Sequence, residues 1–326
     1  MRVTQNALTR QYNKTLNSNL DKMNKVNKKI ISQRKFDRAS ENSIGAAKAL
    51  NVRRSLAKID MYENNLKSAQ SVLSAAENVM MNASSITQSA TEAIIYGSNS
   101  TQGDSERTII AGNLRNLANE LLKELNADFA GRSLFGGTYN DAAPFEIKDG
   151  ELYFNGEAID DAASLSDLPG TKDVYVDIGL DIRIDGAGNV DPQTALKVSI
   201  NGAEAIGWGK DADGDPKNLV SLILLAAQAL ESGDSKAAMK YNDKIETSNS
   251  NVLNAVADIG NRSEFIDFNL TRIEANRLSL KETQNDIEGA DVAEEITNYK
   301  TMELAYNATL QMGSALIPPS IFDYIR

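Results

Sequence analysis

Aliphatic residues recur every seventh position in two long stretches of this chain. A repeat held over so many heptads predicts long helices that wind around partners with a left-handed supercoil. At 1.5 Å per residue the second stretch alone is a rod of about 63 Å, which cannot fold back into a compact ball by itself. The seam of the first stretch is formed by Ile59, Leu66, Leu73, Met80 and Ile94, interrupted by Thr87, and that of the second by Ile245, Val252, Ile259, Ile266, Ile273, Leu280 and Ile287.

The two stretches lie in opposite halves of the chain, and neither contains proline. A self-contained helical bundle is one explanation, but the separation of the two stretches favours their pairing with each other. A shorter helix is expected near residues 110–125, where apolar residues have helical spacing. Polar residues beside the second seam, such as Ser248 and Arg262, are expected to fix its register.

The segment between the stretches has a different composition. Residues 131–216 contain 17 Asp or Glu and 6 Lys or Arg, whereas the rest of the 326-residue chain is neutral. Alternating strands are predicted in FEIKDGELYFNG, with an Asp149-Gly150 turn, in VYVDIGLDIRIDG, and on both sides of Asn201-Gly202.

The fold class follows from this order of elements. We predict an α+β protein in which antiparallel coiled-coil or helical-bundle arms from both termini enclose a β-rich insert in the middle of the chain. The expected domains are 1–42 with 290–326 (a terminal axial coiled coil), 43–130 with 217–289 (a bundle of long helices), and 131–216 (the acidic insert).

The two ends of the chain carry opposite charge. Residues 1–38 contain 10 basic and 2 acidic side chains, and residues 282–303 contain 7 acidic side chains and one lysine. This favours pairing of the terminal helices. A nucleic-acid-binding arm is the rival explanation, but the basic residues are dispersed and no nucleic-acid-binding module accompanies them.

Catalysis has little support in the sequence. The chain has no histidine and no cysteine, which excludes the commonest general base and all thiolate chemistry. The DADGD stretch at 211–215 lacks the Gly and Glu of a calcium loop, because Pro216 and Leu222 stand there. We therefore expect no enzyme activity, cofactor or metal, although a carboxylate-dependent hydrolase in the insert stays open. No signal peptide or membrane span is visible.

The stretch RASENSIGAAKAL at 38–50 lies between two predicted helices. Ser40 and Asn42 are good N-cap residues, and the alanines that follow favour helix. The local explanation is a capped restart of the helix.

Three segments carry a resemblance to a known family. SQRKFDRASENSIGAAKALNVR, together with RVTQNAL at the start and EGADVAEEITNYKTMELAYNATLQMGSALIPPSIFDYIR at the end, resembles the bacterial flagellin-type axial proteins. The family often has proline where Ser43 stands, so the break here is expected to be softer. Within the family, GRSLFGGTYNDAAPFE is most similar to the hook-associated protein 3 group. The resemblance covers about residues 1–145 and 217–326.

The resemblance implies a structural protein that assembles itself. A chain of this kind is exported by the flagellar type III apparatus to the extracellular flagellum and forms a homo-oligomeric ring at the junction between hook and filament. Its implied partners are its own copies, neighbouring hook-associated protein and flagellin subunits, and an export chaperone at the C-terminal segment, with no nucleic acid. A flagellin that forms the filament itself is the alternative.

The resemblance and the apolar helix faces together suggest which residues contact other subunits. In the linker, Arg38 and Glu41 are expected to face neighbours, and Gly45 to permit close helix approach; the alternative is an ordinary capped turn. Pro318 and Pro319 are expected to end the last helix, leaving an apolar cluster at Ile321–Ile325. The expected contact residues are Leu8, Tyr12, Leu16, Met23, Ile30, Arg38, Glu41, Gly45, Tyr299, Leu310, Leu316, Ile317 and Phe322.

Overall fold

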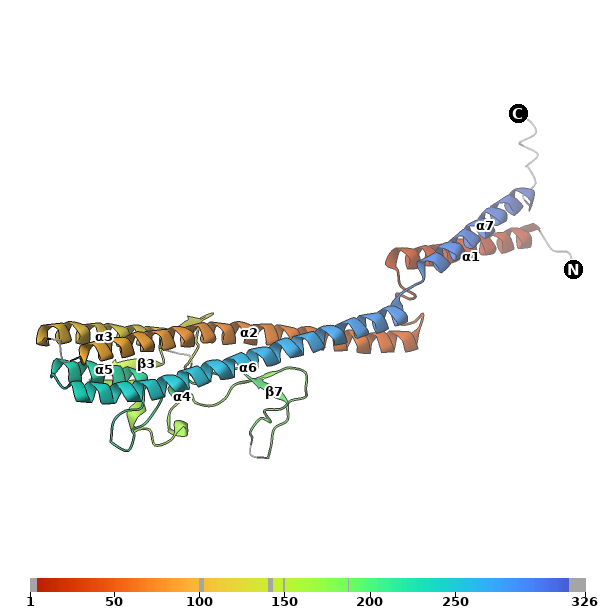
Figure 1. Cartoon of the computed structure of the whole chain (residues 1–326). Coiled ribbons are helices and arrows are strands. Elements are labelled where there is room, and N and C mark those ends of the chain that lie inside the picture. The colour runs from red at the N-terminus through yellow and green to blue at the C-terminus, as the bar shows by residue number, and fades with distance from the viewer. Residues whose placement is uncertain (1–4, 100–102, 140–142, 149, 187, 317–326) are drawn as a thin grey trace. The chain divides into compact units, whose positions relative to one another are not determined.

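A computed structural model describes residues 5–99, 103–139, 143–148, 150–186 and 188–316 (Figure 1). The chain divides into two compact units. Unit 1 comprises Met1–Lys58 and Ala275–Arg326, and unit 2 comprises Ile59–Glu274. The finer division of the chain at residues 42–43 and 289–290 stays a prediction.

Unit 1 is built around two terminal helices that pack on each other, α1 (Gln5–Ser32) and α7 (Val292–Leu316). They run antiparallel, since Asn19 Nδ2 donates to Thr309 Oγ1 at 2.9 Å and Lys29 Nζ lies 3.1 Å from a Glu295 carboxylate oxygen. Gly313 lies so close to the Tyr12 ring that a Cβ there would be 2.2 Å from the hydroxyl oxygen. The small residue therefore sets the spacing of the two helices at this end.

Two helices far longer than average contain the heptad repeats: α2 (Ser43–Gly97) and α6 (Ser235–Glu288). Within unit 2 the seam residues of both helices from Leu66 to Ile94 and from Ile245 to Ile273 lie in one buried cluster. Thr87, the polar member, is buried and donates its hydroxyl to the Ala83 carbonyl at 2.7 Å. The internal hydrogen bond removes the cost of burying that hydroxyl.

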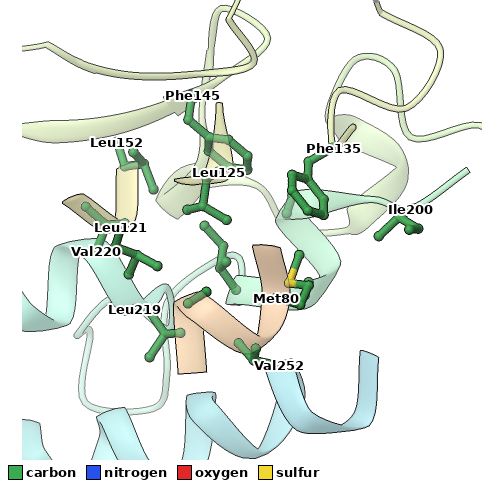
Figure 2. Close-up of a cluster of buried hydrophobic side chains, with 14 of the residues drawn as sticks. Met80, Leu121, Leu125, Phe135, Phe145, Leu152, Ile200, Leu219, Val220 and Val252 are labelled. Carbon is green, nitrogen blue, oxygen red and sulfur yellow. The ribbon is translucent and has the colours of Figure 1, made fainter. Parts of the chain in front are cut away.

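Two shorter helices complete the helical part of unit 2, α3 (Asp104–Leu125) and α5 (Leu219–Glu231), which pack on each other. Gly97 lets α2 approach both, because a Cβ there would lie 2.8 Å from Leu230 and 3.2 Å from Ile110. Figure 2 shows the core that results, where Met80, Leu125 and Val252 come from three different helices.

In the described residues, the insert contributes short antiparallel strands, two 3-10 helices and one short α-helix. β3 and β4 pair with Lys148 opposite Glu151, which leaves the two-residue turn predicted at Asp149-Gly150; Asp149 lies outside the described residues. Phe145 and Phe154 are opposite each other in this hairpin and bury their rings in the core. The strands are β1 (Asp128–Phe129), β2 (Arg132–Ser133), β3 (Phe145–Lys148), β4 (Glu151–Phe154), β5 (Glu157–Ala158), β6 (Tyr175–Asp177) and β7 (Ala195–Lys197), and the 3-10 helices are η1 (Ile159–Asp161) and η2 (Leu165–Asp167).

The order of helical arms around a middle insert with small antiparallel sheets confirms the predicted α+β class. The strand predicted after Asn201-Gly202 is wrong, because the chain forms helix α4 (Gly202–Ile206) there. Asn201 acts as its N-cap and accepts a hydrogen bond from the Ala203 amide at 3.1 Å. Asparagine serves turns and N-caps equally well, and the alanines that follow favour the helix.

Polar residues beside the seam of α6 bind backbone carbonyls of the insert and of Lys217, the residue that directly follows it. The hydroxyl of Ser248 lies 2.9 Å from the Ile206 carbonyl and 3.0 Å from that of Lys217, and Arg262 donates to the Ser199 carbonyl at 3.1 Å. These contacts give donors to carbonyl groups at the end of a short helix and in irregular segments. The side chains expected to fix the register of the coiled coil therefore also fasten the insert to it.

We predict that Ile266→Asp destabilises unit 2 by about 3 kcal/mol or more, because it places an unpaired carboxylate at a fully buried seam position. Phe268→Asp is the matched control, since Phe268 is 69% exposed on the same helix. Urea unfolding followed by circular dichroism measures both. An Ile266→Asp variant as stable as the control would show that the seam contributes little to the core.

Candidate functional site

The links between helices in unit 1 lie side by side and are hydrogen-bonded. One link joins α1 to α2 and the other joins α6 to α7. The Lys35 amide donates to the Glu288 carbonyl at 2.7 Å, and the Ala290 amide donates to the Gln33 carbonyl at 2.9 Å. Arg34 and Gly289 form an antiparallel bridge between them. The two helix breaks are therefore paired with each other. We call this paired segment, residues 33–42 and 289–291 with the last residues of α6 (286–288), the double linker.

A side-chain N-cap begins helix α2. Of the two candidates, Asn42 takes the role, because its side-chain oxygen accepts the Gly45 amide at 2.8 Å. A Cβ on Gly45 would lie 2.6 Å from the Asn42 side chain and 2.9 Å from the Phe36 ring. Gly45 thus makes room for Phe36, which is only 9% exposed, within its own chain.

Arg38 and Glu41, the two linker residues expected to face neighbours, are both exposed. A Glu41 carboxylate oxygen accepts the Asp37 amide at 3.0 Å, and this hydrogen bond lowers the pKa of the Glu41 carboxyl. Glu41 therefore braces the turn of its own chain, while the Arg38 side chain is open to solvent. The geometry leaves Arg38 available for a partner.

One ion pair and one side-chain hydrogen bond stabilise the double linker. Arg53 on α2 lies 2.7 Å from the carboxylate of Glu288, whose side chain is only 6% exposed. Lys35 donates its ammonium to the Asp286 carbonyl at 2.7 Å. A buried carboxylate without its cation is costly, so the Arg53–Glu288 pair ties the start of α2 to the end of α6.

The expected contact residues on the terminal helices occupy the partly covered faces of α1 and α7. Tyr12, Leu16, Met23, Ile30 and Tyr299 are half-buried, whereas Leu8 and Leu310 are exposed. The Leu316 side chain, Ile317 and Phe322 lie outside the described residues.

Sequence reasoning missed three exposed apolar residues on α7, namely Ile296, Leu304 and Met312. The distribution of apolar residues around α7 was the sequence signal that could have identified them. Apolar side chains occur on more than one face of this helix, whereas those of α1 are concentrated on a single face.

Two lysines of α6 form ion pairs with the aspartates of the acidic loop at 211–215. Lys244 Nζ lies 2.5 Å from both Asp211 and Asp215, and Lys240 lies 3.1 and 3.0 Å from Asp213 and Asp215. Burial favours the neutral form of Lys244, yet its hydrogen bonds to the carboxylates outweigh this and raise its pKa. Bonds to these lysines lower the pKa values of all three aspartates. Lysine ammonium groups thus provide the positive charge among the carboxylates.

We predict that Lys244→Met lowers the melting temperature at pH 7 by a few degrees, and that the difference from wild type vanishes on acidification. Carboxyls with lowered pKa values stabilise the folded state above their unfolded pKa of about 4, and this contribution is lost as pH falls through the folded values. Melting curves between pH 7 and pH 2.5 measure it, with the exposed Lys236→Met as control. A deficit that persists unchanged at the lowest pH would contradict the electrostatic explanation.

Comparison with known proteins decides the family. The profile of the bacterial flagellin N-terminal helical region matches residues 3–140, and that of the flagellin C-terminal helical region matches residues 242–318. Together they cover about two thirds of the chain. The chain belongs to the flagellin family. Members of this family are structural proteins, which confirms the prediction that the chain is not an enzyme.

Solved structures share the fold of this family member. A putative flagellar hook-associated protein from Vibrio parahaemolyticus is 20% identical with a TM-score of 0.60, over 76% of this chain and 100% of that chain. FlgL from Xanthomonas campestris is 20% identical (TM-score 0.55; 72% and 99%). Flagellar hook-associated protein-3 from Legionella pneumophila is 15% identical (TM-score 0.51; 72% and 98%).

No curated protein matches the chain. Within the described ranges, no helix combines the length and the apolar character needed to cross a bilayer.

Proposed function

We propose that this flagellin-family chain assembles with copies of itself into the junction between hook and filament of the bacterial flagellum. Three observations support the proposal: the family itself, the fold shared with FlgL and hook-associated protein-3, and the segment GRSLFGGTYNDAAPFE. A structural role also agrees with a chain that has neither histidine nor cysteine.

The observation that supports self-assembly most directly is the incomplete burial of the terminal helices. Across residues 7–32 and 292–313, whose exposure the structure describes, no hydrophobic side chain is buried. Unit 2, in contrast, buries its seam residues almost completely. A helix pair that buries so little apolar area is marginal in water unless further helices cover it.

The arrangement of apolar residues on α7 indicates that this helix needs more than one helical neighbour. Thr309 and Gly313 contact α1. At 100° per residue, Ile296 and Leu304 lie on another side of the helix, and they are 47% and 70% exposed. Because α1 covers only the first side, α7 needs a second helical neighbour, which a further copy of the chain or a related flagellar subunit supplies.

The proposal includes partners and a place. A chain at this junction contacts its own copies, the neighbouring hook-associated protein and flagellin, and, before export, a chaperone that binds the C-terminal segment. The apolar cluster at Ile321–Ile325 supports the chaperone contact by its composition. The proposed location is the extracellular flagellum, reached through the flagellar type III export apparatus.

The test is a strain that lacks this chain and is complemented with variants. Electron microscopy of the deletion strain should show hooks without filaments, with flagellin shed into the medium. Wild-type chain should restore filaments, whereas Ile296→Asp with Leu304→Asp should not, because two carboxylates on the open side of α7 prevent its covering. Ile109→Asp, at a position 71% exposed on α3, is the control and should restore them.

Two results would overturn the proposal. Normal filaments in the deletion strain would show that no junction depends on this chain. Long filaments formed by the purified chain alone at high salt would instead make it the filament-forming flagellin, a function that its family also allows.

A further inference from the structure

Unit 1 contains an open groove beside the double linker, where the end of α1 meets residues 35–42. Its lining is strongly basic. The groove is lined by Lys25, Lys28, Lys29, Lys35, Phe36, Asp37, Arg38, Glu41 and Asn42.

Some of these charges are already engaged within the chain. Lys29 pairs with Glu295, Lys35 donates to the Asp286 carbonyl, and the Glu41 carboxylate accepts the Asp37 amide. Lys25, Lys28 and Arg38 are exposed. Among the described residues, no ion pair or side-chain hydrogen bond occupies these three cations. The five basic side chains of the groove outnumber its two carboxylates, Asp37 and Glu41, so the groove presents a surface with excess positive charge.

The same unit has a complementary acidic surface at the end of α6 and the start of α7. Glu288 and Glu295 pair with Arg53 and Lys29 of their own chain. Glu282, Asp286 and Glu294 are exposed, and within the described ranges no ion pair engages their carboxylates. We call these three residues the acidic strip.

Groove and strip lie at the same level of unit 1. Lys35 is hydrogen-bonded to Glu288 through the backbone, and Lys29 pairs with Glu295, so residues 25–38 run beside residues 282–295. A second copy placed alongside with little displacement presents its strip at the level of the first copy's groove. Two different surfaces that match each other form a head-to-tail contact, the kind that generates rings or helical arrays.

We propose that the basic groove of one copy binds the acidic strip of the neighbouring copy. Lys25, Lys28 and Arg38 on one chain then face Glu282, Asp286 and Glu294 on the next. The inference rests on the proposed function, since it names the contact by which the copies associate. Charge complementarity of this kind mainly sets which surfaces meet and in which register.

Because the chain has no cysteine, a single-cysteine variant cannot form a disulfide within its own chain, and every disulfide that it forms joins it to another molecule. A strain is made to express Lys28→Cys and Glu294→Cys chains together, each distinguished by a different epitope tag, and its isolated flagella are oxidised. We expect roughly tenfold more mixed dimer than with the Lys14→Cys and Glu294→Cys pair, because a disulfide needs Cα atoms within about 7 Å. Tyr12 lies against Gly313, so Lys14 is offset from Glu294 by about 25 Å along the helices.

Reversing the charges of the groove provides an independent test, because reversing the charges of the strip as well should restore the contact. Lys25→Glu with Lys28→Glu should abolish filament restoration in the deletion strain, and adding Glu282→Lys with Glu294→Lys to the same chain should recover it. Lys14→Glu with Lys22→Glu changes the net charge equally and should restore filaments like wild type. Recovery by the fourfold variant excludes simple misfolding of the reversed chain.

The inference is wrong if the mixed dimer is no more abundant than the control pair, or if the reversed chain restores filaments normally. It is equally wrong if Lys28→Cys cross-links only to a different flagellar protein, which would give the groove another acidic partner. These failures are distinct from failure of the proposed function, in which wild-type chain itself does not restore filaments.

Discussion

The terminal helices α1 and α7 cannot cover all of each other's apolar side chains, and the proposal of self-assembly rests on that constraint. Two helices in contact bury one stripe on each, which suits α1, whose apolar residues follow a single face. In α7 the exposed Ile296 and Leu304 lie on a side that α1 does not reach. A chain with such a pair gains stability by assembling, because assembly buries what the single copy leaves in water.

The rest of the molecule does not depend on assembly in this way. Unit 2 buries the seam from Leu66 to Ile94 and from Ile245 to Ile273 together with α3, α5 and the aromatic residues of the insert. The buried Ser248 hydroxyl finds its hydrogen-bond partners, the Ile206 and Lys217 carbonyls, within the same unit. In unit 1, the double linker holds the two helix breaks together through backbone hydrogen bonds and the ion pair of Arg53 with the buried Glu288 carboxylate. The chain therefore joins a self-sufficient core to an assembly-dependent helix pair.

The sequence predicted the elements that follow from local patterns, namely the long helices and one hairpin. It did not predict the features that depend on tertiary contacts. The heptads gave the two long helices, and the Asp149-Gly150 signal gave the β3–β4 hairpin, because both features are local. The Asn201 strand failed because asparagine fits turns and N-caps alike. Ser40 and Asn42 could not be ranked as caps without the backbone. The anchoring of insert carbonyls by Ser248 and Arg262, and the exposure of Leu304, depend on which segments meet in three dimensions.

Hydrogen exchange of the full chain, as a dilute monomer and in isolated flagella, tests the central claim most directly. Amides exchange from locally open states, so their protection measures the stability of each helix separately. The account predicts that amides of α1 and α7 exchange rapidly in the monomer and slowly after assembly, while the α2 and α6 amides of unit 2 are protected in both. Strong protection of α1 and α7 in the monomer would show that the pair is stable alone and would contradict the account.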